Sequence, residues 1–205
     1  MMLKKSMRVN CDEDGITKAS KIIKKGGVIV FPTDTLYGIG CDPYNSTAIK
    51  KIYEIKSREE KKQLPVLVYS KDVALLIANF DQISKVLAEK FWPGPLTLIL
   101  KVSDESLKKS LNLEEKIAIR VPDNDCTLKL LKKCNFLVGT SANISGQEPF
   151  IDPSVCYESI QGFDLFLDGG KIAGGVASTI VEVMDGRIKI HREGILTIEE
   201  INKVL

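Results

Sequence analysis

Most of the side chains in this sequence that could take part in chemistry lie in three short segments. The first follows the apolar run 28–31 and contains Thr33, Asp34, Thr35 and Tyr37. In an open α/β sheet, loops at the carboxyl ends of strands are where ligands usually bind. The hydroxyl groups of this loop could hold a small polar ligand. Residues of this kind also bond their own backbone in turns, and turn chemistry alone slightly favours that interpretation.

The second segment, residues 56–62, is basic and could bind phosphate. Lys56, Arg58 and Lys62 could converge on one anion, since arginine offers a planar fork of donors and lysine a mobile point charge. Glutamates interrupt the run, and on charge alone a solvated helix end explains the pattern better.

The third segment, residues 139–146, is dense in short hydrogen-bonding side chains. Thr140, Ser141 and Asn143 follow an apolar run directly, and such a loop can offer hydroxyl, amide and backbone N–H groups to an anion or a nucleotide. Surface turns often have the same composition, so a binding loop and a plain turn are about equally supported. No GxxxxGK[ST] motif occurs, and no GxGxxG motif follows a strand, so the usual phosphate-binding fingerprints are excluded.

Isolated residues elsewhere are less informative. Arg120 and Arg192 stand at expected strand ends, where an arginine can clamp an anion or simply face solvent, and Ser178 follows the glycine-rich stretch 169–175. The only histidine, His191, is interpreted as structural. One histidine and five cysteines without a CxxC pair exclude multi-histidine and thiolate metal sites, and they predict reduced thiols rather than disulfides.

Composition limits the class of protein. The chain has 205 residues, of which 44% are hydrophobic and 27% charged, enough apolar material for a folded core and too much for intrinsic disorder. Lysine and arginine number 29 against 27 acids, and the difference of +2 is too small to indicate nucleic-acid binding by bulk charge. Charge-free apolar stretches reach about half of the roughly 20 residues that a membrane helix needs. We therefore expect no membrane contact, and, with no apolar leader, a cytoplasmic protein.

Hydrophobic periodicity predicts the elements that position these residues. Helices are expected at 16–23, 46–56, 71–78, 82–91, 126–133 and 198–205, and strands at 28–31, 64–69, 97–102, 117–120, 136–139, 178–184 and 187–192. Asp185-Gly186 between the last two strands predicts a type I′ hairpin turn. The alternation predicts one α/β domain over residues 1–205, with a mixed sheet, helices on its faces and an antiparallel pair near the end.

In order along the chain, these segments resemble the YrdC-like family in its single-domain form. The matching segments span nearly the whole chain and read GGVIVFPTDTLYGIGCDP, KSREEKKQLPVLV, FWPGPLTLIL, IAIRVPDN, LVGTSANISGQEP, STIVEV and IKIHREG. The resemblance implies a twisted α/β fold with a concave, basic cavity. It also implies synthesis of threonylcarbamoyl-AMP and pyrophosphate from L-threonine, bicarbonate or CO₂, and ATP, as a step of tRNA modification.

The resemblance further implies roles for individual residues. Those on the L-threonine side are Thr33, Thr35, Tyr37, Arg58, Arg120 and Ser178. Those on the nucleotide side are Lys56, Arg58, Lys62, Thr140, Ser141, Asn143 and Arg192, with Lys56 and Arg58 as the expected catalytic pair. No residue is assigned to a metal, since Mg²⁺ would arrive with ATP and be held chiefly by ATP oxygens. Asp34 is the one acid nearby that could take part.

The sequence departs from the family pattern at three positions. Glu59 and Gln63 stand where many relatives have proline, which predicts a more mobile basic loop, and Leu67 stands where some have histidine. The resemblance implies that the product passes to a downstream tRNA threonylcarbamoyl transferase complex. Two other functions stay open at this point: a non-catalytic module that binds tRNA or double-stranded RNA, and a related enzyme that forms a carbamoyl adenylate from another donor.

Overall fold

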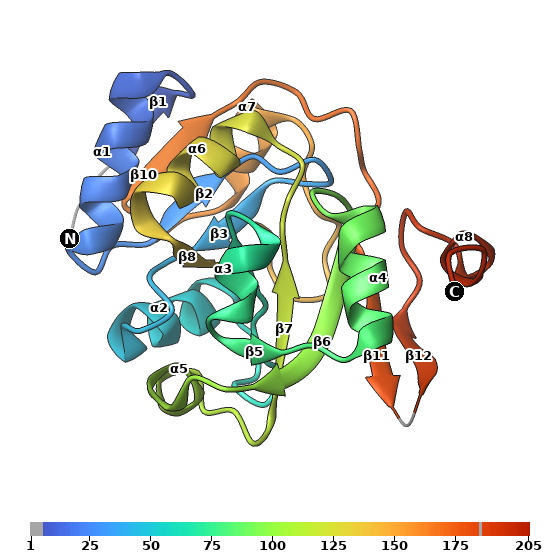
Figure 1. Ribbon diagram of the computed structural model, residues 1–205. Coiled ribbons are helices and arrows are strands. Elements are labelled where there is room, and N and C mark those ends of the chain that lie inside the picture. The colour runs from blue at the N-terminus through green and yellow to red at the C-terminus, as the bar shows by residue number, and fades with distance from the viewer. Residues whose placement is uncertain (1–5, 185) are drawn as a thin grey trace.

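The computed structural model describes residues 6–184 and 186–205. Across these residues the strands form two twisted mixed sheets with helices packed on them (Figure 1), which confirms the predicted fold class but divides the strands between two sheets. The single-domain organisation stays a prediction. Asp185 of the predicted type I′ turn and the first five residues, at the start of the segment searched for a leader, lie outside the described residues.

The first sheet carries the loop with the threonine side chains. In order, its strands are β1 (Met7–Asn10), β10 (Leu165–Asp168), β2 (Ile29–Phe31), β3 (Gly38–Gly40) and β9 (Thr140–Ser141). β2 and β3 pair antiparallel, so residues 32–37 form the connection of a hairpin. A Cβ atom at Gly40 would come within 1.9 Å of the Val138 carbonyl oxygen, so only glycine allows this close approach.

The second sheet forms the wall opposite that loop. Its strands run β12 (Arg187–Arg192), β11 (Thr179–Met184), β6 (Leu96–Val102), β7 (Lys116–Arg120), β4 (Val66–Val68) and β8 (Phe136–Val138), and β5 (Ala78–Asn79) pairs with β6. The alternation of side chains along a strand divides β6 into two faces. Leu96, Leu98 and Leu100 lie in the main hydrophobic core, whereas Thr97 and Ile99 face the other side.

Most helices begin at capping residues that the sequence supplies. The helices are α1 (Glu13–Lys24), α2 (Ser46–Lys56), α3 (Lys71–Leu75), α4 (Gln82–Phe91), α5 (Glu105–Ser110), α6 (Asp125–Cys134), α7 (Pro153–Ser159) and α8 (Ile198–Asn202). Asp12, Asn45, Asp81 and Asn124 each accept a hydrogen bond from a backbone N–H of the first turn of the helix that follows. Each such cap stabilises its helix by about 1 kcal/mol.

The elements expected from periodicity are present, and several short ones were missed. The helix expected at 71–78 ends at Leu75, because Ala78 and Asn79 pair with β6 instead, and α8 ends at Asn202. The elements that the periodicity did not predict are β1, β3, β5, β9, β10, α5 and α7. β11 and β12 pair antiparallel as predicted.

The helices α1 and α6 lie side by side (Figure 1), with α1 against β10 and β2 of the first sheet and α6 against β4 and β8 of the second. Ile16 and Ile23 of α1 and Leu130 of α6 form a second hydrophobic cluster with residues of β2 and β10. Burying each such side chain contributes about 1.5–3 kcal/mol. This packing fixes the helices behind the loop that connects β2 to β3.

The prediction that all cysteines are reduced is wrong for one pair. Cys11 and Cys126 form a disulfide between the start of α1 and the first turn of α6. The two cysteines are 115 residues apart in the sequence, and only the packing of α1 against α6 brings them together. The local sequence therefore gives no indication that they pair. Cys41, Cys134 and Cys156 are free, and burial raises the pKa of the Cys134 and Cys156 thiols to about 12.

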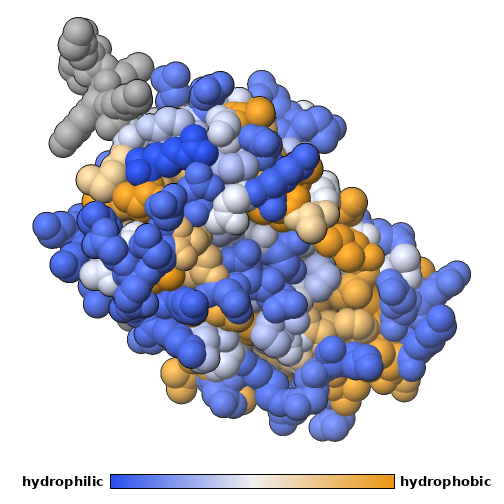
Figure 2. Space-filling model, turned by 90° about the horizontal axis from the view of Figure 1, so that it is seen from above, coloured by the Kyte–Doolittle hydropathy of each residue, from blue (hydrophilic) through white to orange (hydrophobic). Residues whose placement is uncertain are grey.

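Among the described residues, no helix is both long and apolar enough to cross a bilayer. Seen from above, the surface is mostly hydrophilic with a band of exposed hydrophobic side chains (Figure 2). Leu76, Val176 and Met7 are among the exposed large apolar residues, and single ones are common on folded proteins.

Candidate active site

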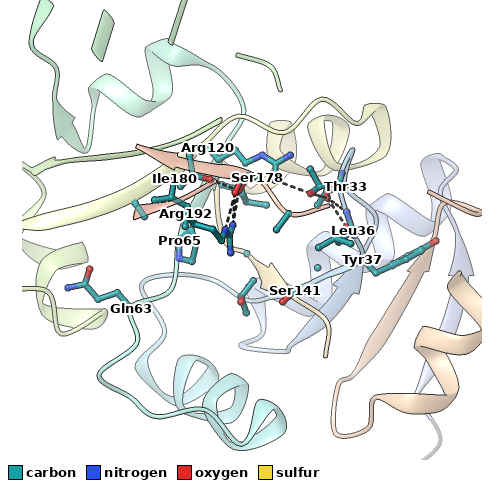
Figure 3. Close-up of a pocket in the computed structure, with 18 of the residues that line it drawn as sticks. Thr33, Leu36, Tyr37, Gln63, Pro65, Arg120, Ser141, Ser178, Ile180 and Arg192 are labelled. Atoms are coloured by element: carbon teal, nitrogen blue, oxygen red, sulfur yellow. Dashed lines mark hydrogen bonds between the residues drawn. The ribbon is translucent and has the colours of Figure 1, made fainter. Parts of the chain in front are cut away.

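A cavity of about 360 Å³ lies where the hairpin loop of the first sheet faces the second sheet, within the usual size range of small-molecule sites. Figure 3 shows its side chains converging from both sheets. Nine of the residues predicted for the site line it: Thr33, Thr35, Tyr37, Arg58, Arg120, Thr140, Ser141, Ser178 and Arg192. Three predicted residues do not line it: Lys56, Lys62 and Asn143.

Thr33 and Thr35 line the cavity, and their hydroxyl groups brace their own loop. Thr33 Oγ1 donates to the Leu36 carbonyl oxygen at 2.7 Å and accepts from the Thr35 and Leu36 amides at 3.1 Å. Thr33 Oγ1 and Thr35 Oγ1 are 3.0 Å apart. The loop is therefore a self-bonded turn, as turn chemistry predicted, and its binding of a ligand stays a prediction.

Tyr37 is fixed by contacts outside the cavity. Its hydroxyl donates to the Gly170 carbonyl oxygen at 2.7 Å and accepts from the Gly169 amide at 3.1 Å. Its ring stacks on Phe166 with the centroids 5.2 Å apart. In Figure 3 the hydroxyl end of Tyr37 points away from Ser178 and Arg192. Tyr37 thus lines the cavity without offering it the hydroxyl that the sequence suggested.

Arg120 is held by a carboxylate and an adjacent hydroxyl. Its Nη2 donates to Asp34 Oδ1 at 2.6 Å, its Nη1 to Thr35 Oγ1 at 3.1 Å, and its Nε to the Gly94 carbonyl oxygen at 2.9 Å. The guanidinium is almost fully buried, with 7% of the side chain exposed. Asp34 therefore neutralises one of the three arginines and ties the loop of the first sheet to β7.

Arg192 lines the cavity and is held by neutral groups. Its Nε and Nη2 donate to the Ser178 carbonyl oxygen at 3.0 and 2.8 Å, and Nη2 also reaches Ser178 Oγ at 3.2 Å. Ser178 Oγ lies 2.8 Å from Thr97 Oγ1, a residue that sequence reasoning missed. No acidic residue in the described ranges forms an ion pair with Arg192. Neutral acceptors orient this guanidinium without neutralising it.

Arg58 is held in the same way by its own loop. Its Nε donates to the Lys62 carbonyl oxygen at 3.0 Å and its Nη2 to the Gln63 carbonyl oxygen at 3.2 Å. No ion pair to Arg58 occurs among residues 6–184 and 186–205. Lys62 contributes only this carbonyl, because its ammonium lies on the exposed side, 4.0 Å from Glu59. In this structure the Lys62 side chain does not line the cavity, and its role in nucleotide binding stays a prediction.

The three arginines share one electrostatic field. Burial lowers the pKa of Arg192 from its ordinary value, and the positive charges of Arg120 and Arg58 lower it further. Burial also lowers the pKa of Arg58 and of Arg120, and Asp34 partly opposes the shift of Arg120. Guanidinium groups nonetheless stay protonated in proteins. The cavity therefore carries positive charge that an anion would relieve.

Lys56 and Asn143 lie behind the cavity wall and bind each other. The Lys56 ammonium donates to the carbonyl oxygens of Ser141 and Asn143, the latter at 2.7 Å, and to Asn143 Oδ1 at 3.2 Å. Lys56 is 1% exposed. Burial lowers the pKa of its ammonium to about 8, and the charge of Arg58 adds to this shift. The structure therefore places neither side chain against the space that a ligand would fill.

An apolar wall completes the cavity and was not predicted as part of the site. Ile99, Ala118 and Ile180 line it, and their strands place Ile99 beside Ala118. The alternation of β6 could have indicated Ile99 and Thr97, since they share the face opposite the three core leucines. His191 also lines the cavity, and its Nε2 lies 2.6 Å from Oε2 of the buried Glu182.

The part of the chain that the structure describes contains no preformed metal site. There, no group of three or more histidine, cysteine, aspartate or glutamate side chains converges. Asp34 Oδ1 accepts from Arg120 and, at 3.2 Å, from the Asp123 amide. The acid that the sequence suggested for Mg²⁺ is therefore already engaged by a cation.

Sequence comparison identifies relatives of the whole chain. The model of the Sua5, YciO and YrdC proteins, described as telomere recombination, matches residues 21–194. Threonylcarbamoyl-AMP synthases of Pyrococcus abyssi and Bacillus subtilis are 31% and 32% identical over 203 residues, which cover 98% and 96% of this chain and 60% and 58% of the relatives. The chain thus spans about 60% of the length of these two proteins. A Methanocaldococcus jannaschii protein is 35% identical over 182 residues, covering 88% of this chain and 86% of the relative.

Structural comparison agrees with the sequence. The crystal structure of P. abyssi Sua5 complexed with L-threonine matches with a TM-score of 0.89 at 30% identity, covering 98% of this chain and 61% of that chain. Escherichia coli YciO matches with a TM-score of 0.85 at 24% identity, covering 98% of this chain and 100% of that chain. The second match, at this identity, concerns the fold alone.

Proposed function

The chain belongs to the Sua5/YciO/YrdC family, and from that premise we propose that it is an L-threonylcarbamoyladenylate synthase, a nucleotidyltransferase of tRNA modification. Two relatives named for this synthase and the L-threonine complex of P. abyssi Sua5 support the proposal. Within this chain, the observation that carries it is the cavity that Arg58, Arg120 and Arg192 line together with Thr33 and Thr35.

The proposed reaction combines L-threonine, bicarbonate and ATP and gives threonylcarbamoyl-AMP, pyrophosphate and water. The amine of threonine attacks the carbon of bicarbonate, water and a proton leave, and the resulting carbamate oxygen attacks the α-phosphorus of ATP. The bond from that phosphorus to the bridging oxygen breaks, and pyrophosphate departs. The carbamate is the nucleophile, so the protein needs no nucleophilic side chain. Orienting the reactants can lower the barrier by about 7–11 kcal/mol in favourable cases.

The arginines would divide the work of binding. Arg58 and Arg192 carry charges that no described acid neutralises, so they suit the phosphates of ATP and the negative charge that grows on the leaving pyrophosphate. Arg120, fixed by Asp34, would orient the L-threonine side together with the hydroxyls of Thr33 and Thr35. Thr140 and Ser141 supply neutral donors on the nucleotide side, and Ser178 holds Arg192 in place.

Magnesium would enter as part of the substrate. The described residues provide no carboxylate cluster in the cavity, and Asp34 is bound to Arg120. We therefore propose that ATP arrives as its Mg²⁺ complex with the ion held by ATP oxygens. The protein's own contribution to charge neutralisation is then its guanidinium groups. The product would be consumed by a tRNA threonylcarbamoyl transferase complex.

The test is a reaction of the purified protein with ATP, L-threonine and bicarbonate. We expect pyrophosphate release that depends on all three compounds, and threonylcarbamoyl-AMP identified by mass spectrometry. Replacing L-threonine and bicarbonate with carbamoyl phosphate should abolish product. An RNA-binding module would bind tRNA but release no pyrophosphate. Absence of threonine-dependent pyrophosphate release would overturn the proposal.

A matched pair of variants tests the placement of the basic segment. Arg58→Ala removes a guanidinium that lines the cavity, and we expect pyrophosphate release to fall by about 100-fold or more, as for other groups that stabilise transition-state charge. Lys62→Ala removes a cation of the same segment whose ammonium faces away, so turnover should stay within about twofold, as is usual for exposed charges. Equal losses in both variants would contradict this assignment.

A further inference from the structure

We propose that Lys56 is a positioning residue: its ammonium group holds the backbone of residues 141–145 against α2, and so presents Ser141 to the cavity, without binding the substrate anion itself. The inference rests on the proposed function only for the identity of that anion. A lysine in a basic segment can bind phosphate directly as a point charge. The contacts of Lys56 indicate a different use of its charge.

The three N–H bonds of the ammonium group match three acceptors. These acceptors are the carbonyl oxygens of Ser141 and Asn143 and the side-chain oxygen of Asn143. A lysine ammonium has three donors and no acceptor, so its hydrogen-bonding capacity is fully used. To reach a phosphate, Lys56 would have to leave all three oxygens without this partner in a buried place, which is costly.

The backbone around Lys56 fastens the same loop from a second point. The Ser145 amide donates to the Lys56 carbonyl oxygen at 2.9 Å, so both the side chain and the main chain of Lys56 bind the loop. Asn143 Nδ2 donates onward to the Gln147 carbonyl oxygen. Ser141, in β9, pairs with Gly38 and lines the cavity. The loop is therefore clamped between α2 and β3, with Ser141 on the ligand side.

The end of α2 separates Lys56 from Arg58. Ser57 is the C-cap and has a φ of 47°, in the left-handed region, so the chain turns sharply between the two basic residues. As a result, Lys56 points into the protein and Arg58 lines the cavity. The lowered pKa of the buried ammonium agrees with a group shielded from solvent and not facing an open polar space.

The first test uses the unaltered protein, so it does not depend on whether a variant folds. Lysine labelled with ¹⁵N is introduced, and the Lys56 ammonium signal is assigned by comparison with Lys56→Arg or Lys56→Met. We expect a signal protected from solvent exchange without nucleotide and unchanged when Mg²⁺–ATP or inorganic pyrophosphate is added. A signal that appears, moves strongly or loses protection on addition of either anion would overturn the proposal.

The second test measures the loop itself by hydrogen exchange without nucleotide. In Lys56→Met, amides of residues 141–145 should exchange about tenfold faster or more, because hydrogen bonds to a charged group are lost. Lys50→Met, an exposed lysine of the same helix, should leave them unchanged. Unchanged exchange in Lys56→Met would also overturn the proposal.

The third test separates positioning from direct charge attraction. In Lys56→Met, ATP affinity should fall while its dependence on salt stays that of the unaltered protein, whereas Arg192→Met should flatten that dependence, because screening acts on a cation that faces the ligand. A flatter dependence in Lys56→Met would indicate direct contact. If the unaltered protein released no pyrophosphate, the proposed function would fail, but the signal and exchange tests would still decide the role of Lys56.

Discussion

The Asp34–Arg120 pair offers a sharp test, because Asp34 could serve either the fold or a metal ion. Asp34 Oδ1 accepts from Arg120 Nη2 at 2.6 Å and from the Asp123 amide at 3.2 Å. Only 15% of the Asp34 side chain and 7% of the Arg120 side chain are exposed. The substitution Asp34→Asn keeps an oxygen at this place and removes its charge. It leaves a buried guanidinium with no carboxylate partner.

The expected loss of stability follows from that uncompensated charge. Removing one partner of a buried ion pair costs about 3–5 kcal/mol. The remaining asparagine oxygen can still accept one hydrogen bond, worth about 1 kcal/mol. We therefore expect Asp34→Asn to lower the free energy of unfolding by roughly 2–4 kcal/mol. For a chain of this size each kcal/mol lowers the melting temperature by about 2–4 °C, so a decrease of roughly 4–16 °C is expected.

The assay is urea unfolding followed by circular dichroism, with Asp14→Asn as the control. Asp14 pairs with Lys18 on the surface, where the side chains are 73% and 48% exposed, so its loss should leave the free energy of unfolding nearly unchanged. The double variant Asp34→Asn/Arg120→Met should recover part of the stability, since no unpaired charge remains. Equal losses for Asp34→Asn and Asp14→Asn would refute the reasoning. So would a change in the Mg²⁺ dependence of ATP binding, which would indicate a metal ligand.

Three other substitutions have expected outcomes. Arg192→Met should weaken ATP binding about 10- to 100-fold in calorimetry, since hydrogen bonds to charged groups contribute about 1.5–3 kcal/mol; unchanged affinity would remove Arg192 from the site. Tyr37→Phe loses the contacts to the glycine-rich loop and should lower the free energy of unfolding by about 1–2 kcal/mol. It should raise the KM for threonine more than that for ATP, and equal effects on both would identify the loop as a scaffold. Glu182→Gln tests pH dependence: burial alone would raise the pKa of Glu182, but hydrogen bonds from Lys116 and His191 bring it below its ordinary value of 4.5. The stability gap between the unaltered protein and Glu182→Gln should be full above pH 4.5 and narrow as the pH falls below it, because the unfolded state then binds the proton more readily; a gap that does not change with pH would contradict the assignment.

Periodicity predicted the elements that owe their form to local sequence. α4 and α2 begin and end at the residues expected from their patterns. The missed strands β3 and β9 have three and two residues, and both exist through pairing with distant segments. Gly38–Gly40 has no apolar alternation that would indicate a strand. Long-range pairing of this kind leaves no periodic signal in so short a segment.

The residue types of the candidate site could be predicted from the sequence, but the directions in which their side chains point could not. Hydroxyls and arginines after strands indicated a polar site, and nine of the predicted residues line one cavity. The sequence gives no sign that Tyr37 turns its hydroxyl toward Gly170, or that Lys56 is buried, because both depend on which surface packs behind the loop. Asp34 is a similar case: its role is set by Arg120, 86 residues away.

What distinguishes the three arginines is the charge of the groups that hold them. Asp34 neutralises Arg120, so this side chain can orient a ligand but adds little net attraction. Carbonyl and hydroxyl oxygens hold Arg58 and Arg192. These neutral acceptors fix each guanidinium group without neutralising its charge. Two like charges, held near each other in a partly buried cavity, are unfavourable until an anion arrives. The cavity should therefore favour a ligand with two or more negative charges over a single carboxylate. Inorganic pyrophosphate should accordingly compete with ATP more strongly than acetate does at equal ionic strength.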